Sequence, residues 1–317
     1  MIMASVQSWV GSELAPQSGF INLSNDCLEE VIGISKLLKA NPMPILAISP
    51  EDCELPHFSN LSKQIRETLN HGLGFCILNK LPVENMSECE VTIIYWLLAQ
   101  LVGRPVAQKW SDGRMIYSVT DLGRPSGNGV RPDVTNEEQS FHTDNSYNIS
   151  PPDHVGLLCL HPAAEGGLSR IVNMLAVLEV MNDQYPDLVP RLYQPYFFDR
   201  QREHSYTERK TIFTPLLCDQ EGRLRVRVSR NLIYQGYHLE GKIIDKTSEA
   251  ALDAFFSVID DSKMYIEFQF EPGQIQFLNN RLIGHKRTGF KDAPEMGVKR
   301  KLYRIWLREN GKRFYNG

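Results

Sequence analysis

Apolar residues recur every three or four positions through much of the first hundred residues. Residues 28–40, LEEVIGISKLLKA, show this spacing, and the Asn-Pro that follows ends the predicted helix. A second helix is predicted over 59–72. Ser87 and Glu90 form a capping-box sequence that opens a third helix. We therefore predict that residues 1–105 are mainly helical support.

Beyond residue 105 the pattern changes to short β-type runs separated by turn residues, with helices predicted at 173–186 and near 248–260. The predicted strands are 73–80, 114–119, 154–160, 166–174, 211–218, 224–234, 264–270, 273–278 and 301–307. Many short strands, with helices concentrated at one end, predict a mainly β sandwich or jelly roll over 106–310. No linker divides the chain, so residues 1–317 are predicted to form a single domain.

Residues 121–140, DLGRPSGNGVRPDVTNEEQS, interrupt this alternation with a polar stretch rich in Gly and Pro. Twenty residues without apolar periodicity inside a compact domain are typical of a functional loop. Because the stretch runs directly into His142, we interpret it as a lid over a site rather than a passive surface excursion.

Composition is that of a soluble globular protein, with 42% hydrophobic and 23% charged residues. A net charge of -4 gives no electrostatic reason to expect nucleic acid or an anionic membrane as a partner. The first residues lack the basic start and apolar run of a secretory signal, and the longest apolar window, 91–102, is too short to span a bilayer. Six cysteines without a Cys-x-x-Cys pair indicate reduced thiols and a cytoplasmic location. The oligomeric state is left open.

The first candidate for chemistry is the stretch 141–154, FHTDNSYNISPPDH, in which one residue separates His142 from Asp144. In an extended segment, side chains at i and i+2 point the same way and can bind one metal ion. A facial site for non-haem iron needs two imidazoles and one carboxylate. The chain has eight histidines, and the candidates for the third ligand are His154, His161, His204, His238 and His285.

His285 is preferred because it follows a predicted strand and precedes a basic strand expected to neighbour it in an antiparallel sheet. Spacing alone leaves the other four histidines open. The pair is also weak evidence by itself, since His142 can be a hydrogen-bonded core residue and Asp144 a turn former.

The basic strand 299–310, KRKLYRIWLREN, places three arginines on one face, at positions 300, 304 and 308. The opposite face suits a core, so geometry alone does not decide whether the arginines face solvent or the interior. An arginine facing inward near a metal has a clear use, because its planar fork binds a carboxylate through two hydrogen bonds. Such an arginine implies an acidic small molecule.

Four blocks together carry a family resemblance: HTDNSY, PPDHVGLLCLHPAAEGGLS, NNRLIGHKRTGF and RKLYRIWL. In this order and spacing they resemble the taurine dioxygenase and clavaminate synthase-like superfamily of iron(II)- and 2-oxoglutarate-dependent oxygenases, over roughly residues 70–310. The resemblance implies a double-stranded β-helix, or cupin-like jelly roll, with flanking helices. It also implies iron(II) as cofactor and 2-oxoglutarate and dioxygen as co-substrates.

Carried onto this sequence, the resemblance implies His142, Asp144 and His285 as iron ligands and Ser169 as a contact of 2-oxoglutarate. Arg300 would pair with the far carboxylate of 2-oxoglutarate. Arg304 would lie near its C1 carboxylate or near the primary substrate, and the division between the two arginines is left open. Lys286 departs from the Gly or Arg that often follows the distal histidine. The plain structural alternatives are that Ser169 belongs to a simple turn and that Trp306 and Phe141 are core residues.

The implied activity is oxidation, by default hydroxylation, of a small organic substrate with release of succinate and carbon dioxide. Desaturation and ring formation stay open, because both begin with the same hydrogen abstraction. The competing hypotheses are a cupin-like hydrolase or isomerase that needs no 2-oxoglutarate, and a non-catalytic relative. Substrate choice is expected in the lid and in the span 195–210. Five arginines there are compatible with an anionic or amino-acid-like compound: Arg124, Arg131, Arg200, Arg202 and Arg209.

Overall fold

The computed structural model describes residues 6–124, 131–220, 222–293 and 297–317. Its largest sheet has the order β1-β2-β14-β6-β17-β3. β4 pairs with the first half of β17, on the same edge as β3. The strands are β1 (Phe20–Asn22), β2 (Phe75–Asn79), β14 (Ile275–Asn279), β6 (His154–His161), β17 (Lys301–Arg308), β3 (Arg104–Val106) and β4 (Ile116–Thr120). Apart from the parallel pair β1 and β2, the pairings are antiparallel.

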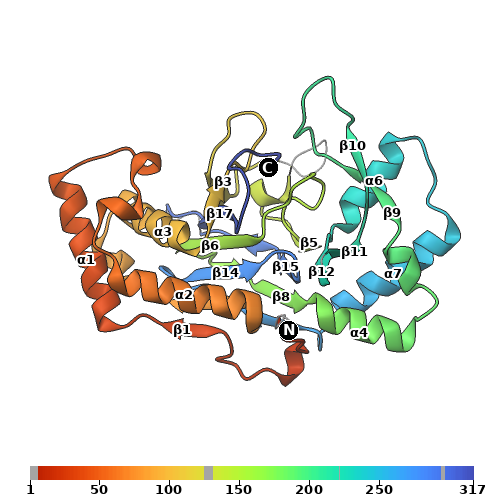
Figure 1. Cartoon of the computed structure of the whole chain (residues 1–317), viewed down its shortest axis with the longest axis horizontal. Helices are drawn as coiled ribbons and strands as arrows, with labels where there is room; N and C mark the ends of the chain where they lie inside the picture. The colour runs from red at the N-terminus through yellow and green to blue at the C-terminus, as the bar shows by residue number, and fades with distance from the viewer. Residues whose placement is uncertain (1–5, 125–130, 221, 294–296) are drawn as a thin grey trace.

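A four-stranded antiparallel sheet, of order β13-β8-β15-β5, faces the large one. Its strands are β13 (Tyr265–Phe268), β8 (Ser169–Asn173), β15 (Ile283–Arg287) and β5 (Gln139–His142). Buried side chains from both sheets meet in one apolar cluster, including Val155 and Leu278 from the large sheet and Ile171 and Ile283 from the small one. The space between the two sheets is therefore a shared core (Figure 1).

Three N-terminal helices cover the outer face of the large sheet: α1 (Asn25–Ala40), α2 (Pro56–His71) and α3 (Glu88–Val102). The capping box predicted at Ser87 and Glu90 is present at the start of α3. This helix is apolar on almost every side because it lies between the sheet and the other two helices. Short 3-10 turns connect these elements and later ones: η1 (Gly11–Glu13), η2 (Ile45–Ala47), η3 (Pro50–Asp52), η4 (Val83–Asn85) and η5 (Pro132–Val134). Among the described residues, no helix is both long and apolar enough to cross a membrane.

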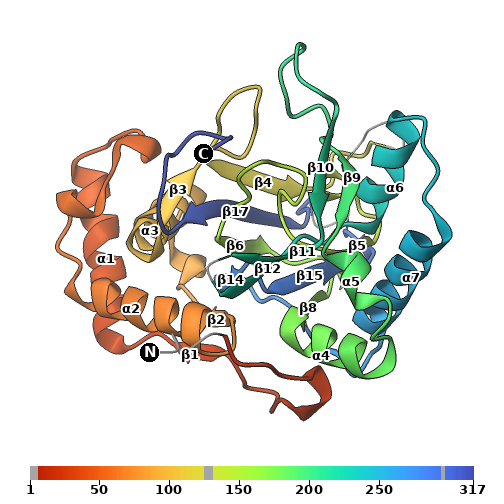
Figure 2. The same cartoon turned by 45° about the vertical axis from the view of Figure 1, so that its right-hand side comes forward.

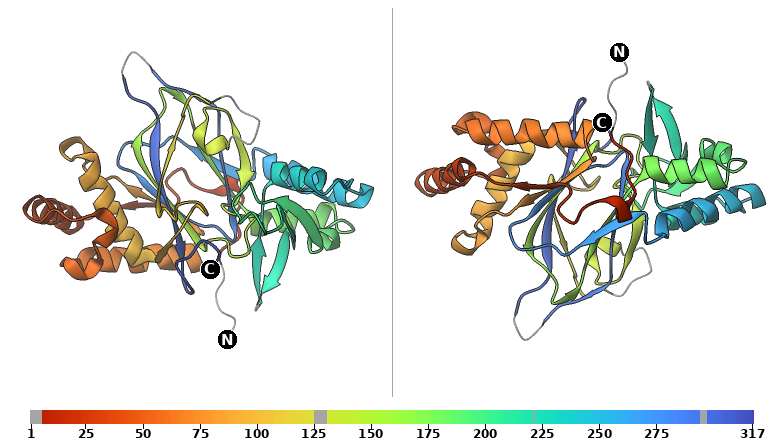
Figure 3. Two further views of the ribbon diagram at one scale, coloured as in Figure 1. Left: turned by 90° about the horizontal axis from the view of Figure 1, so that it is seen from above. Right: turned by 90° about the horizontal axis from the view of Figure 1, so that it is seen from below.

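A second helical group lies on the other side of the sheets, so the prediction that helices gather at one end is wrong (Figure 3). It consists of α4 (Met174–Gln184), α5 (Val189–Leu192), α6 (Arg230–Leu239) and α7 (Lys246–Asp260). Asn173 caps α4 through its side chain, as its position before the helix predicts. Two hairpins accompany this group, and Figure 2 shows the first of them beside α6. They are β9 (Pro195–Asp199) with β10 (Thr211–Pro215), and β11 (Leu217–Gln220) with β12 (Arg223–Val226). A further short pair is formed by β7 (Glu165–Gly166) and β16 (Phe290–Lys291).

Two sequence predictions need correction. The strand predicted over 224–234 ends at Val226, and helix α6 begins at Arg230, because the buried positions change there from alternation to the spacing of Ile233, Gly236 and Tyr237. The basic strand β17 does not neighbour the strand of His285. β15 lies between β8 and β5 in the small sheet, whereas β17 belongs to the large sheet. His285 and the arginines of β17 therefore approach each other across the core, from opposite sheets.

Candidate active site

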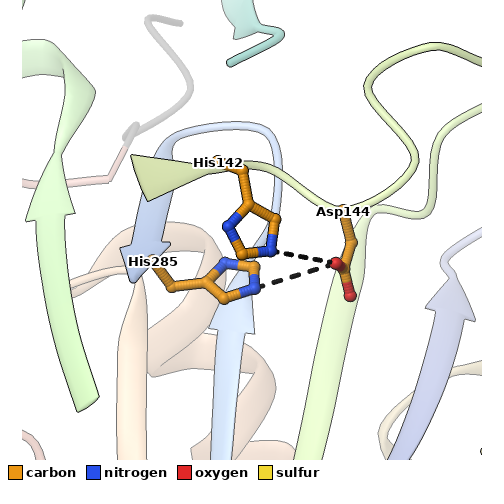
Figure 4. A group of neighbouring side chains, drawn as sticks. All are labelled: His142, Asp144 and His285. Carbon is orange, nitrogen blue, oxygen red and sulfur yellow. Dashed lines mark ion pairs between the residues drawn. The ribbon is translucent and has the colours of Figure 1, made fainter. Parts of the chain in front are cut away.

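The structure brings His142, Asp144 and His285 together in one group (Figure 4). His142 ends β5 and pairs in register with His285 of β15. Asp144 Oδ1 lies 3.5 Å from His142 Nε2 and 3.8 Å from His285 Nε2. One ligand atom from each residue falls within 4.8 Å of the others, a spacing suited to a single metal ion. In the part of the chain that the structure describes, no other histidine joins this group.

Each imidazole directs its Nε2 toward Asp144. The Nδ1 of His142 lies 2.9 Å from the carbonyl oxygen of Ser140. A carbonyl only accepts hydrogen bonds, so this contact places the proton on Nδ1 and leaves Nε2 as the ligand atom. Burial, with the neighbouring His142, lowers the pKa of His285 to about 3. His285 is therefore neutral at physiological pH, as metal binding requires.

Asp144 is held on both carboxylate oxygens. Trp306 Nε1 donates to Oδ2 at 2.7 Å, and Arg304 donates to Oδ1 at 3.3 Å. Burial alone would raise the pKa of Asp144, but the charge of Arg304, together with the adjacent imidazoles, outweighs it and holds that pKa well below its usual range. The carboxylate is thus charged, and Oδ1 is the oxygen directed toward the two histidines.

The backbone of Asp144 is fixed by Asn280, a buried residue in the loop before β15. Its side chain accepts from Asp144 N at 2.7 Å and donates to the carbonyl oxygens of Asp144 and Pro152 at 2.9 and 3.1 Å. The Asn280 side chain therefore holds the segment of His142 and Asp144 against the loop that leads into the strand of His285.

The sequence analysis missed the contact made by Trp306, which it assigned to the core. Trp306 is indeed 2% exposed, but its indole N–H faces the site. The available signal was strand periodicity, because Trp306 shares a face of β17 with Arg304. Arg308 lies on the same face, but its guanidinium binds carbonyl oxygens of the C-terminal segment, including those of Lys312 and Phe314.

A small cavity of about 50 Å³ lies beside His142 and His285 and is also lined by Ser169 and Arg300, among others. Arg300 is 5% exposed, and its Nη1 has no hydrogen-bond partner among the described residues. Burial and the nearby Arg287 lower the pKa of Arg300 to about 10, so the guanidinium stays charged at neutral pH. A buried cation with an open donor is suited to an anionic ligand.

Gly167 makes room for Arg300. Its φ is +67°, and a Cβ built on it would lie 3.2 Å from Arg300 Nε. A side chain at this position would therefore meet the guanidinium as well as strain the backbone. This packing accounts for the second glycine in the sequence EGGLS that leads to Ser169.

Arg287 also lines this cavity, with Arg300 and Arg304, as a buried arginine that was not predicted from the sequence. Arg287 and Arg300 both lie over the ring of Phe290, at 4.8 and 5.2 Å from its centre. Arg287 also donates to the carbonyl oxygen of Glu137 and, at 3.4 Å, to that of Pro132.

Lys286, the departure from the family pattern, forms ion pairs with Glu138 and Asp260. The histidine ligand set is thus unaffected by this lysine.

A larger cleft of about 1520 Å³ opens from His142 and Asp144. Its walls include residues 131–147, the span 199–206 and one side of α6. The lid stays a prediction: residues 125–130 lie outside the described residues, and several residues from 131 onward line the cleft. Several residues of the span 195–210, among them Arg202 and Tyr206, also line the cleft, and their part in substrate choice stays a prediction.

Glu203, also missed from sequence, joins three segments around this cleft. Its Oε1 lies 3.0 Å from Lys109 Nζ and 2.8 Å from a guanidinium nitrogen of Arg131, and its Oε2 accepts from Trp110 N at 2.7 Å. Arg131 and Arg200, two of the arginines considered for an anionic substrate, are therefore already paired, since Arg200 contacts Glu208 at 3.2 Å.

Two facing sheets that hold a two-histidine, one-carboxylate group beside a cationic cavity define a non-haem metal oxygenase by class. The chain belongs to the taurine catabolism dioxygenase TauD, TfdA family, whose model matches residues 39–306. The resemblance drawn from the motifs is confirmed, and the chain is an iron(II)- and 2-oxoglutarate-dependent dioxygenase.

Individual relatives are distant. FR-33289 synthase of Streptomyces rubellomurinus is 24% identical over 291 residues, which cover 90% of this chain and 84% of that protein. Taurine hydroxylase-like protein SAT17 of Stachybotrys chartarum is 24% identical over 318 residues, covering 94% of this chain and 77% of that protein.

Solved structures share the fold. Asparagine oxygenase, in complex with Fe(II), 2S,3S-3-hydroxyasparagine and succinate, aligns with a TM-score of 0.70 and 16% identity, over 92% of this chain and 94% of that one. The non-heme iron oxygenase OrfP, in complex with Fe and alpha-ketoglutaric acid, aligns with a TM-score of 0.67 and 16% identity over the same shares. The prediction of a sheet-rich oxygenase fold with flanking helices is confirmed at this level.

Proposed function

We propose that His142, Asp144 and His285 hold iron(II), that Ser169 and Arg300 hold 2-oxoglutarate, and that the enzyme hydroxylates a small molecule bound in the larger cleft. Succinate and carbon dioxide are the co-products. The observation that carries this proposal is the position of one His-Asp-His group between two spaces. One is a small cavity with a buried, open guanidinium, and the other is a cleft large enough for an organic substrate.

The three residues fit iron(II). Two imidazoles and one carboxylate are a donor set suited to this metal, and no fourth His, Cys, Asp or Glu of the described residues joins them. Bound iron with 2-oxoglutarate supplies the oxidation of a C–H bond by dioxygen. The chain itself orients the Asp144 carboxylate through Trp306 and keeps the His285 imidazole neutral.

The open donor on Arg300 supports its assignment to the far carboxylate of 2-oxoglutarate. Arg304 is less available, because Gln108 accepts from its Nε at 2.9 Å and Asp144 accepts from another of its nitrogens. Arg304 also lines both spaces. It therefore suits a position between the C1 carboxylate and the primary substrate.

We further infer a double-stranded β-helix and a single domain over residues 1–317. Strands alternate between the two sheets along the chain, with β5 and β8 in the small sheet on either side of β6 in the large one, and β15 between β14 and β17. This interleaving supports a jelly roll better than two sheets formed from separate segments. The six cysteines, all within described parts of the chain, are free thiols, which supports a cytoplasmic location.

For the substrate, an amino-acid-like compound is proposed. The structural neighbours carry hydroxyasparagine in one case and hydroxy-L-Arg in another, and this chain shares their fold over 92% of its length. A reaction that does not require 2-oxoglutarate, as in a cupin-like hydrolase or isomerase, leaves the open donor of Arg300 without a use.

Anaerobic addition of iron(II) and 2-oxoglutarate to the protein tests the function. A weak visible charge-transfer band is expected from the chelated keto acid, followed by succinate when oxygen is admitted. Iron bound at one equivalent with no band and no succinate would favour the hydrolase. A protein that binds neither iron nor 2-oxoglutarate would be a non-catalytic relative.

A further inference from the structure

Two buried polar atoms that line the larger cleft have no hydrogen-bond partner among the described residues. They are Oδ1 of Asp133, an acceptor, and Nδ2 of Asn145, a donor. Asp133 is 6% exposed and Asn145 is 4% exposed. Buried polar atoms nearly always have hydrogen-bond partners in folded proteins. Two such atoms without partners at the wall of a substrate cleft therefore suggest that the ligand supplies the partners.

The donor of Asn145 has a fixed direction. Asn145 Oδ1 accepts from Tyr315 Oη at 3.1 Å, which leaves its Nδ2 as the free end. The residue has φ of +56°, a left-handed conformation that few residues other than glycine adopt and that asparagine tolerates best. A strained, oriented and unpaired amide directly after Asp144 is typical of a residue that contacts a ligand.

The acceptor of Asp133 is open because the cations around it have other partners. Arg304 approaches Asp133 Oδ2 to 3.7 Å but donates to Gln108 and Asp144. Arg131 pairs with Glu203, and Arg287 donates to backbone carbonyls. Asp133 Oδ1 therefore keeps its full capacity to accept a hydrogen bond, and the residue lines both the cleft and the small cavity.

We propose that this pair recognises a primary amine: Asp133 accepts from the substrate's ammonium group, and Asn145 donates to a neighbouring carboxylate, amide or sulfonate oxygen. The inference rests on the proposed function and deepens it by naming the substrate class. It favours a zwitterionic compound over a purely anionic one, because the open atom of Asp133 at the cleft is a carboxylate oxygen, which an ammonium group suits and an anion does not.

Matched probes test the proposal. Enzyme loaded with iron(II) and 2-oxoglutarate is given the twenty common L-amino acids and taurine, and for each active compound its amine-free counterpart, such as succinamate for L-asparagine or ethanesulfonate for taurine. Succinate release above the rate without substrate is measured. We expect at least one amine to stimulate release about 10-fold, and its amine-free partner to have little effect. Equal stimulation by both partners, or none by any amine, overturns the proposal.

Two isosteric variants locate the effect. Asp133→Asn removes the charge without changing shape, and Asn145→Asp exchanges the donor for an acceptor while keeping the oxygen that Tyr315 contacts. Each is expected to raise KM for the active amine about 10-fold or more, and Asn145→Asp, whose residue lines the larger cleft and not the small cavity, is expected to leave KM for 2-oxoglutarate within 2-fold. Asp183→Asn, an exposed carboxylate on α4, is the matched control. An unchanged KM for the amine in Asp133→Asn overturns the assignment.

Failure of the amine subsite and failure of the proposed function give different results. If the visible band forms in wild type and in both variants but amines are not selected, only the subsite is wrong. If iron binds without a band, the dioxygenase assignment is wrong. Calorimetric titration of the amine probes into metal-free wild type and Asp133→Asn then judges the subsite by itself, with equal affinities overturning it.

Discussion

The candidate metal centre and the substrate cleft share residues but are built in opposite ways. Two of the three predicted ligands, His142 and His285, lie on paired strands, and the carboxylate and backbone of Asp144 are held by Trp306, Arg304 and Asn280. The cleft is walled largely by loops, and there Asp133 and Asn145 each retain an atom without a partner in the described chain.

This difference separates the residues that carry the reaction from the residues that select the substrate. A carboxylate that Trp306 and Arg304 hold beside two strand-borne histidines keeps its geometry before any ligand arrives, which favours a fixed reaction. Unpaired atoms on loops gain their partners only from the right ligand, which favours discrimination. Changes at the metal centre should therefore affect every substrate alike, whereas changes in the cleft should affect affinity for the substrate alone.

The largest effect is expected from Asp144→Ala. It removes the only anionic ligand and leaves Arg304 and Trp306 without their acceptor. Iron affinity should fall by more than the ~100-fold typical of changes to outer contacts of a metal site, and succinate formation should stop. Iron content and succinate are measured together. Asp153→Asn, which alters a nearby carboxylate paired with Arg225 and Arg281, should keep its iron. Retained iron and turnover in Asp144→Ala would contradict the ligand assignment.

Arg300→Ala should come next. Removing a buried guanidinium opposite a carboxylate typically costs about 2–5 kcal/mol, so the dissociation constant of 2-oxoglutarate should rise steeply while iron binding is unchanged. The intensity of the visible band against 2-oxoglutarate concentration reports this affinity. Arg170→Ala, a partly exposed arginine paired with Glu267, is the control. Unchanged affinity in Arg300→Ala would transfer the role to Arg304.

Trp306→Phe probes the orientation of Asp144. An aromatic ring is kept, but the pyrrole part of the indole and its donor to Oδ2 are lost, so the carboxylate is no longer held in one orientation. Iron affinity should fall by about 10- to 100-fold. Trp96→Phe removes a comparable buried indole N–H, which donates to the carbonyl of Ile48 far from the site. It should reduce stability without altering iron affinity. Equal iron affinities for Trp306→Phe and wild type would reduce Trp306 to a core residue.

The same division explains what the sequence could predict. The capping box of α3 and the Asn173 cap of α4 were predictable because their partners lie within a few residues. Trp306 and Asp144 are 162 residues apart, and Arg287 and Glu137 are 150 apart, so neither contact has a local signal. The metal group itself was reached through the family resemblance, since the neighbouring-strand argument for His285 placed it in the wrong sheet.

Glu203→Gln should give the smallest effect, and it is the strictest test of whether the metal centre and the cleft act independently. Glu203 connects Lys109, Arg131 and the backbone of Trp110 around the cleft, and it touches none of the predicted metal ligands. The amide keeps one acceptor oxygen but weakens charged hydrogen bonds, each worth roughly 1.5–3 kcal/mol, of which part should appear as a few-fold rise in KM for the primary substrate.

Iron affinity and KM for 2-oxoglutarate should not change in Glu203→Gln, because its partners belong to the loop half of the site. Glu208→Gln is the matched control: it lies in the same loop and pairs with Arg200 at a more exposed position. If Glu203→Gln instead lowered iron affinity while Glu208→Gln did not, the loops would help to set the metal geometry, and chemistry and substrate choice would not be separable in this enzyme.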